Sequence, residues 1–380
     1  MGKLRALYIC PATKAAIVAV APVLTIGRDY EVVKTLLLRG IADPMAPTAD
    51  EQVDAIWPAT AITAFLASRN IAVVQVDAPP YDPDAWRDKI GDALTLELLA
   101  DIDLILFNGQ AGTKQMSFGI WDGLTDTIRP HPARNLEVRR CYVNSDTAVK
   151  VQIGRTHSAI DDISIADILT IYGFEEVERA RREAGEAWIL RHSDQLVELW
   201  RAKLVAPNEP RAAGIAAQLT RAHPPGPWSV VGLASGGWLE AGIYLQALRR
   251  KQTRPNGNFV ACSTKIWHWA SCEPAQRDAR RTAEKHYEID IAIATNGVLH
   301  LIECKDSMNA LPQEAIHKQA VLRQRLQGRG GVNAIVARNP PEANSVLAQK
   351  AQSNNIGLYL PARAPMTDCF TRIFGPDPAG

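Results

Sequence analysis

Three carboxylates and a lysine interrupt a segment that otherwise reads as buried sheet, residues 287–305, YEIDIAIATNGVLHLIECK. They are Glu288, Asp290, Glu303 and Lys305. Carboxylates that face each other in apolar surroundings repel, and either a raised pKa or a bound cation relieves the repulsion. A hard divalent ion such as Mg2+ or Mn2+ prefers carboxylate oxygens and water. These residue types therefore indicate metal-assisted hydrolysis of a phosphodiester, in which the lysine orients the attacking water or stabilises charge on phosphate.

The spacing of these residues predicts that they share one face of a hairpin. Asn296-Gly297 favours a two-residue turn, because both central residues take positive φ. The resulting register places Asp290 opposite Glu303 and Glu288 opposite Lys305. The alternative is a surface hairpin whose outer face is solvated, with Glu288 and Lys305 as a weak ion pair. Apolar residues on both faces of the segment favour a covered sheet instead.

Glu240 is the candidate for a third carboxylate. It falls in the first turn of a helix expected in SGGWLEAGIYLQALR. It either stabilises the helix dipole or joins the hairpin as a metal ligand.

Glu240, Asp290 and the run Glu303-Cys304-Lys305 together resemble the PD-(D/E)xK motif of restriction-endonuclease-like nucleases. Ile289 stands where that motif has its proline. The resemblance implies that Glu240, Asp290, Glu303 and Lys305 are catalytic and that the three carboxylates bind the metal. It also makes Gln319, in the helix QEAIHKQAVLRQRLQ, a candidate for contact with the site, although it could equally be solvated helix surface.

The elements that must position these residues form an α/β protein in three parts. Residues 1–150 alternate apolar strands with helices, which predicts a Rossmann-like parallel sheet covered on both faces. Residues 151–225 are more charged and predict a helical connector that ends in a linker at PPGP. Residues 226–380 predict the restriction-endonuclease-like domain, in the order helix, strands, hairpin, helix, strand, helix, strand.

The loop after the fourth expected strand, in LILFNGQAGTKQMSFG, is the second candidate site. Strand-to-helix turns at the carboxyl edge of a parallel sheet bind ligands, and helix N-termini suit phosphate. A tight turn without ligand is the alternative. NGQAGTKQM resembles the ligand loop of CARF domains, with Ala111 where a glycine is common. This resemblance implies ligand contacts from Asn108, Gly112, Thr113 and Lys114, and from Thr13 in the loop after the first strand.

The two resemblances together cover essentially the whole chain and match the CARF nucleases of type III CRISPR defence. They imply a homodimer that binds a cyclic oligoadenylate, with cyclic tetra-adenylate matching two-fold symmetry. They also imply Mn2+- or Mg2+-dependent cleavage of DNA, RNA or both, switched on by that ligand. The alternatives are a CRISPR-independent restriction or repair nuclease, and a nucleotide-sensing binding protein without catalysis.

Charge and cysteine usage restrict the remaining possibilities. The net charge of +1 indicates no partner by itself, but residues 241–331 carry fourteen Lys or Arg against eight Asp or Glu, which suits a polyanion. The six cysteines form no CxxC pair and indicate reduced thiols in a cytoplasmic protein. Cys262, His268 and Cys272 fit no common zinc spacing.

Trp267-His268-Trp269 could stack on bases or belong to the core. The apolar N-terminal run predicts a strand and helix rather than a signal peptide, and no run is long enough to cross a membrane.

Overall fold

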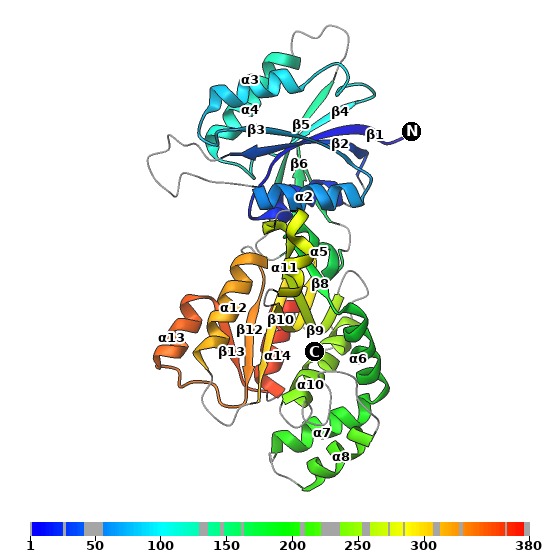
Figure 1. Ribbon diagram of the computed structural model, residues 1–380, viewed down its shortest axis with the longest axis vertical. Helices are drawn as coiled ribbons and strands as arrows, with labels where there is room; N and C mark the ends of the chain where they lie inside the picture. Colours follow the sequence, from blue (N-terminus) through cyan, green and yellow to red (C-terminus); the bar gives the residue numbers. More distant parts are fainter. Residues whose placement is uncertain are drawn as a thin grey trace. The chain divides into compact units, whose positions relative to one another are not determined.

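The chain folds into two compact units. The computed structural model describes residues 2–25, 28–41, 56–128, 136–144, 148–160, 163–205, 210–221, 236–252, 259–272, 274–283, 286–306, 312–326, 330–361 and 363–375. The first unit comprises Met1–Asp161, Asp167–Phe174 and His268–Thr282, and the second comprises Asp162–Ala166, Glu175–Trp267 and Ala283–Gly380. Each unit is built on one sheet (Figure 1).

The first unit contains a seven-stranded sheet in the order β3-β2-β1-β4-β5-β6-β7. The strands from β3 to β5 are parallel, and β6 and β7 continue the sheet antiparallel. This confirms the Rossmann-like parallel sheet. The strands are β1 (Leu4–Pro11), β2 (Tyr30–Gly40), β3 (Ala72–Ala78), β4 (Leu104–Phe107), β5 (Glu137–Asn144), β6 (Lys150–Ile153) and β7 (Thr156–Ala159).

Helices α3 and α4 pack side by side on one face of this sheet (Figure 1). Their close approach requires glycine, because a Cβ on Gly119 or Gly123 of α4 would lie 2.1 Å from Pro83 O or 2.5 Å from Arg87 O of α3. Asp82 caps α3 by accepting a hydrogen bond from Ala85 N. The helices of this unit are α1 (Ala16–Val20), α2 (Ile56–Ser68), α3 (Pro83–Ala93), α4 (Lys114–Ile128), most of α5 (Ile165–Ile171) and most of α11 (Arg277–Ala283), with 3-10 turns η1 (Ala21–Leu24), η4 (Trp269–Ser271) and η5 (Pro274–Gln276).

The second sheet has the order β13-β12-β11-β10-β9-β8. Strands β9, β10 and β11 are antiparallel, whereas β11, β12 and β13 are parallel. Asn296 and Gly297 form the hairpin turn with φ of 50° and 75°, as the sequence predicts. The strands are β8 (Phe174–Val177), β9 (Phe259–His268), β10 (Tyr287–Thr295), β11 (Val298–Lys305), β12 (Asn333–Ala337) and β13 (Ile356–Tyr359).

Helices cover both faces of the second sheet. Residues of α6, α7, α8, α10 and α14 share one core with Ile291 and Ile302 of the hairpin, and α12 and α13 pack with Ile335 on the opposite face. The solvated-hairpin alternative is therefore wrong. The helices of this unit are α6 (Arg179–Arg191), α7 (Ser193–Val205), α8 (Pro210–Arg221), α10 (Trp238–Gln252), α12 (Gln313–Leu326), α13 (Val346–Ser353) and α14 (Arg363–Phe374).

The segment assigned from sequence to a helical connector, residues 151–225, is more varied than expected. Strands β6 and β7 complete the first sheet, and β8 lies at the edge of the second, while helices α6 to α8 pack into the second core. Short, polar edge strands such as THSA of β7 lack the apolar runs that identify buried strands. The PPGP linker lies outside the described residues.

Other expectations can be compared with the described residues. The N-terminal run forms β1 followed by α1. The six cysteines all lie among the described residues, are buried and form no disulfide. Trp267 is buried, and the ring centroid of His268 lies 4.5 Å from that of Phe174. Trp267 and His268 therefore pack inside the protein. Among the helices that the described residues form, none has the length and apolar character needed to cross a bilayer.

Candidate active site and ligand loop

Asp290 and Glu303 lie on neighbouring strands, and both are buried. The predicted register is confirmed from Thr295–Val298 to Ile291–Ile302. Beyond that pair the structure adds a contact that the register does not specify, because Asp290 Oδ2 accepts a hydrogen bond from Cys304 N at 2.7 Å. The Asp290 carboxylate is thereby fixed beside the residue that follows Glu303.

Glu240 joins the hairpin carboxylates from the first turn of α10. Its Oε2 accepts a hydrogen bond from Ser263 Oγ at 3.2 Å. Ser263 has φ of +47° and interrupts the pairing of β9 with β10 between Ile289–Thr264 and Ile291–Cys262. Burial, followed by the charges of Asp290 and Glu288, raises the pKa of Glu240 well above its ordinary value. The structure thus brings Glu240 into the field of the hairpin acids.

Two lysines contact Glu303. Lys305 Nζ lies 2.6 Å from Glu303 Oε1, and Lys318 Nζ lies 2.6 Å from Glu303 Oε2. Burial acts to lower the pKa of Lys305, but the charges of Glu303 and Asp290 outweigh it and raise that pKa above its ordinary value. Lys305 is therefore a firmly charged ammonium at the site. Sequence reasoning missed Lys318, although its place beside Gln319 on α12 was a signal that could have identified it.

Gln319 also touches the site. It is fully buried, so it is not the solvated helix surface considered as an alternative. Its Nε2 donates to Glu303 Oε2 at 3.4 Å, and its Oε1 has no hydrogen-bond partner among the described residues. The orphaned buried oxygen adds a further hard donor atom close to the carboxylates.

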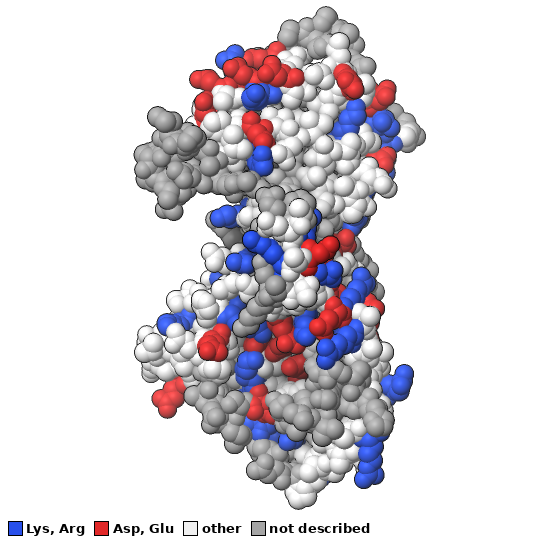
Figure 2. All heavy atoms as spheres, viewed as in Figure 1, with Lys and Arg blue, Asp and Glu red and all other residues white. Residues whose placement is uncertain are grey.

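The site opens into a cleft of about 980 Å³. Glu288, Glu303, Lys305 and Lys318 line it, together with residues from the start of α12. In the space-filling view, acidic atoms gather at the middle of this unit and basic atoms flank them (Figure 2). The cleft therefore gives an external ligand access to Glu288 and Glu303 and to the ammonium groups of Lys305 and Lys318.

The carboxylate oxygens of Glu240, Asp290 and Glu303 are chemically suited to bind a hard divalent cation. Burial, followed by the charge of Glu303, raises the pKa of Asp290 from 3.8 to about 7, and a cation bound to this carboxylate would stabilise its charged form. Carboxylate oxygens from Glu240, Asp290 and Glu303 are the ligands that Mg2+ and Mn2+ prefer. Nevertheless, no three acidic, histidine or cysteine side chains within the described ranges stand in the arrangement of a metal site. Lysine nitrogens face Glu303 instead.

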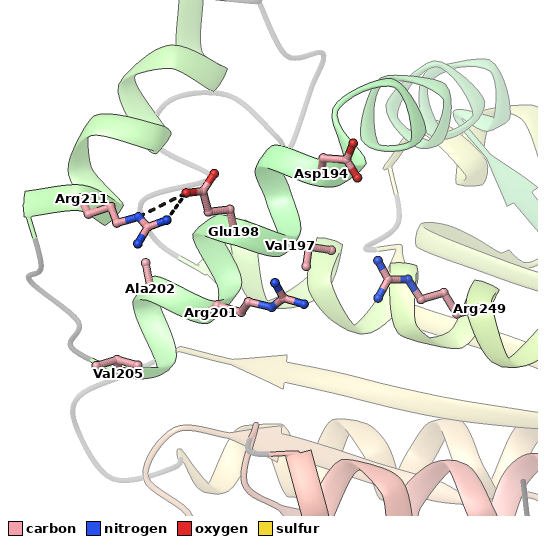
Figure 3. Close-up of a pocket in the computed structure, with 8 residues that line it drawn as sticks. All are labelled: Asp194, Val197, Glu198, Arg201, Ala202, Val205, Arg211 and Arg249. Carbon is pink, nitrogen blue, oxygen red and sulfur yellow. Dashed lines mark hydrogen bonds and ion pairs between the residues drawn. The ribbon is translucent and has the colours of Figure 1, made fainter. Parts of the chain in front are cut away.

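A second cavity of this unit, of about 640 Å³, lies between α7, α8 and α10 (Figure 3). Arg211 pairs with Glu198 at its wall, whereas Arg201 and Arg249 extend into it from α7 and α10. Three arginines outnumber two carboxylates among its lining residues. Its charge suits an anion rather than a metal, so it does not compete with the hairpin cleft as a catalytic centre.

The ligand loop predicted in the first unit lies between β4 and α4. Asn108 is completely buried, its Nδ2 donating to Tyr8 Oη at 3.0 Å and Val18 O at 2.9 Å, while its Oδ1 accepts from Gln110 N. Its polar atoms are therefore engaged inside the protein and shape the loop.

The other loop residues differ in exposure. Thr113 Oγ1 donates to Pro80 O at 2.6 Å and accepts from Met116 N at 3.1 Å, which caps α4. A Cβ on Gly112 would lie 2.9 Å from the Pro11 ring, so this glycine permits the loop to approach the end of β1. Lys114 is exposed and Thr13 half-buried. The parallel strands β1 and β4, each followed by one of these loops, are neighbours in the sheet.

Comparison with known proteins identifies the fold. No protein-family description and no curated protein matches the chain. Among solved structures, Can2 from Sulfobacillus thermosulfidooxidans in complex with cyclic tetra-adenylate is similar, with a TM-score of 0.60 and 17% identity over 97% of this chain and 98% of that one. Protein VC1899 from Vibrio cholerae gives a TM-score of 0.65 and 17% identity over 97% of both chains.

A type III CRISPR defence DNA nuclease activated by cyclic oligoadenylate is also similar, with a TM-score of 0.55 and 15% identity. It aligns with 90% of this chain, which covers 46% of that nuclease. Identities this low establish the fold alone. The chain therefore has the fold of Can2, VC1899 and this CRISPR nuclease, as its resemblance to the CARF nucleases predicts.

Proposed function

We propose that the protein is a metal-dependent nuclease of type III CRISPR defence, activated by a cyclic oligoadenylate. The observation that carries the proposal is the convergence of Asp290, Glu303 and Lys305 at the end of one hairpin, beside an open cleft. Buried carboxylates next to a lysine are suited to metal-assisted phosphodiester hydrolysis. The fold shared with Can2 along nearly the whole chain supports the link to an activator.

Each residue of the site has a distinct task in the proposed reaction. Asp290, Glu303 and Glu240 would hold Mn2+ or Mg2+, which supplies Lewis acidity and a nucleophile at neutral pH when bound. Glu303 holds the Lys305 ammonium at 2.6 Å, where it faces the cleft. Lys305 there stabilises the negative charge that develops on the phosphate oxygens. The hydrogen bond from Cys304 N keeps Asp290 in register with Glu303.

The activator site is proposed at the loops that follow β1 and β4. Lys114 and Thr13 contact the phosphates and Gly112 allows backbone approach, while Asn108 and Thr113 hold the loop in shape. Can2 binds cyclic tetra-adenylate, and a four-fold ring suits a site built from two copies of one surface. The protein would therefore act as a homodimer with one ring between two first units.

Activation follows if the ring binds more tightly to the arrangement in which the cleft accepts nucleic acid. The experiment that tests the nuclease assignment is cleavage of labelled single-stranded DNA, single-stranded RNA and supercoiled plasmid by the wild type and Glu303→Gln. With Mn2+ and cyclic tetra-adenylate present, the wild type is expected to cut at least one substrate and the variant none. Equal cutting by both proteins, or none by the wild type in any combination, would remove the assignment.

A further inference from the structure

Lys318 lies within ion-pair distance of both hairpin carboxylates, Asp290 and Glu303. Its Nζ lies 2.6 Å from Glu303 Oε2 and 4.0 Å from Asp290 Oδ1. Lys305, by contrast, pairs only with Glu303 among the ion pairs of the described residues. The ammonium of Lys318 thus contacts Glu303 and lies within ion-pair distance of Asp290, so it would compete with a divalent cation that these two carboxylates held.

The carboxylates cannot leave this arrangement, whereas the lysine can. The side chain of Glu303 is 1% exposed and that of Asp290 is 9% exposed, and both are fixed on sheet strands. The side chain of Lys318 is 28% exposed and lines the cleft of about 980 Å³. Its flexible four-carbon stem allows the ammonium to turn outward into water without a change in the backbone.

From this geometry we propose that Lys318 is a built-in counter-cation, which neutralises the carboxylate pair until a divalent metal displaces it. Two buried carboxylates without a cation would destabilise the folded protein, and the lysine relieves this repulsion. An ammonium and a divalent ion cannot share the same two oxygens, because they repel each other strongly in a poorly solvated site. Metal entry therefore requires Lys318 to move into the cleft, where it is free to contact substrate phosphate.

The inference rests on the proposed metal-dependent function, since it concerns the same carboxylates. The two proposals predict different effects of a substitution on metal affinity, because Lys318 competes with the metal and does not bind it. Removing a residue that helps to bind the metal weakens binding. Removing a competitor strengthens it.

Binding of Mn2+ alone, measured by titration calorimetry without nucleic acid or activator, tests the inference. Lys318→Met keeps the length of the side chain and removes its charge, and is expected to bind Mn2+ at least about tenfold more tightly than the wild type. Lys318→Arg keeps the charge and should bind about as the wild type does. Lys350→Met, on the exposed surface of α13, is the matched control and should leave the affinity unchanged.

Thermal unfolding gives a second readout that remains valid if Lys318→Met is less stable. Without metal the variant is expected to melt below the wild type, and saturating Mn2+ should close or reverse the difference. An unchanged or weaker affinity in Lys318→Met, together with a melting difference independent of Mn2+, would overturn the inference. If the wild type cleaves nucleic acid in that case, the proposed function stands. If neither protein binds Mn2+, both proposals fail.

Discussion

The indole nitrogen of Trp238 donates a hydrogen bond to Asp306 Oδ2 at 2.5 Å, joining the start of α10 to the end of β11. Arg338 Nε lies 2.8 Å from the other oxygen of this carboxylate. Trp238 precedes Glu240 by two residues, and Asp306 directly follows Lys305. This contact therefore fixes the start of α10, which carries Glu240, relative to Lys305 at the end of β11.

Replacing Asp306 should impair catalysis although Asp306 does not face the substrate. Asp306→Asn keeps the shape of the side chain but removes its negative charge. That charge pairs with Arg338 and strengthens the hydrogen bond from Trp238. By analogy with residues that orient metal ligands, we expect a loss of about 10- to 100-fold in cleavage rate and in Mn2+ affinity. A melting curve of the variant, measured beside that of the wild type, distinguishes this loss of rate and affinity from unfolding of the protein. Full activity and affinity in the variant would show that α10 is positioned without this contact.

Removal of the charges to which we assign catalysis should separate chemistry from activator binding. Lys305→Ala and Glu303→Gln are expected to lower the cleavage rate by at least about 10³-fold. The first removes the ammonium that would stabilise charge on phosphate, and the second removes a carboxylate that would hold the metal. Binding of cyclic tetra-adenylate, measured by calorimetry, should be unchanged in both. A variant that cuts at the wild-type rate would show that the reaction uses other residues.

The exposed lysine of the ligand loop should contribute to activator affinity. Lys114→Ala is expected to raise the Kd for cyclic tetra-adenylate at least about tenfold, because a charge-assisted contact to phosphate is lost. Lys89→Ala, on the exposed surface of α3, is the matched control. Equal affinities of the two variants would place the activator elsewhere.

His300 makes the stability of the second unit depend on pH. Its ring is buried, its Nδ1 accepts a hydrogen bond from Val332 N at 3.0 Å, and burial lowers its pKa from 6.5 to about 3. The unfolded chain therefore binds a proton below pH 6.5 that the folded chain rejects. Stability from this residue is complete above pH 6.5 and should fall by about 2 kcal/mol between pH 6.5 and 5.

His300→Gln provides the test, because its amide oxygen can accept the same hydrogen bond without titrating. Chemical unfolding at pH 7.5, 6.5 and 5 should show a smaller acid-induced loss of free energy in the variant than in the wild type. Parallel pH profiles for the two proteins would mean that His300 is protonated in the folded state.

Features governed by local chemistry could be predicted from sequence. The Asn296-Gly297 turn fixed the hairpin register because its backbone conformation depends on those two residues. The apolar runs of β1 and β4 predicted a parallel sheet, and that sheet is present. In these cases each residue's preference and its final environment agree.

Features that depend on packing between segments distant in the chain could not be predicted from the sequence. The hydrogen bond from Ser263 to Glu240 needs an irregularity in β9 that no local pattern marks. The contact of Lys318 with Glu303 depends on which side of α12 meets the sheet. Asn108 lies inside the protein because Tyr8, which is remote in sequence, offers its hydroxyl there. A motif specifies residue types, whereas the fold decides which of their atoms are already engaged.

The central claim is that a ligand bound to the first unit controls chemistry in the second. The most direct measurement is the initial rate of cleavage by the wild type with Mn2+ as cyclic tetra-adenylate is titrated, using the substrate that is cut fastest. We expect a rate near zero without activator and a saturable rise as activator is added, with Lys114→Ala requiring more activator to reach the same maximum. A rate that does not depend on activator concentration would contradict it.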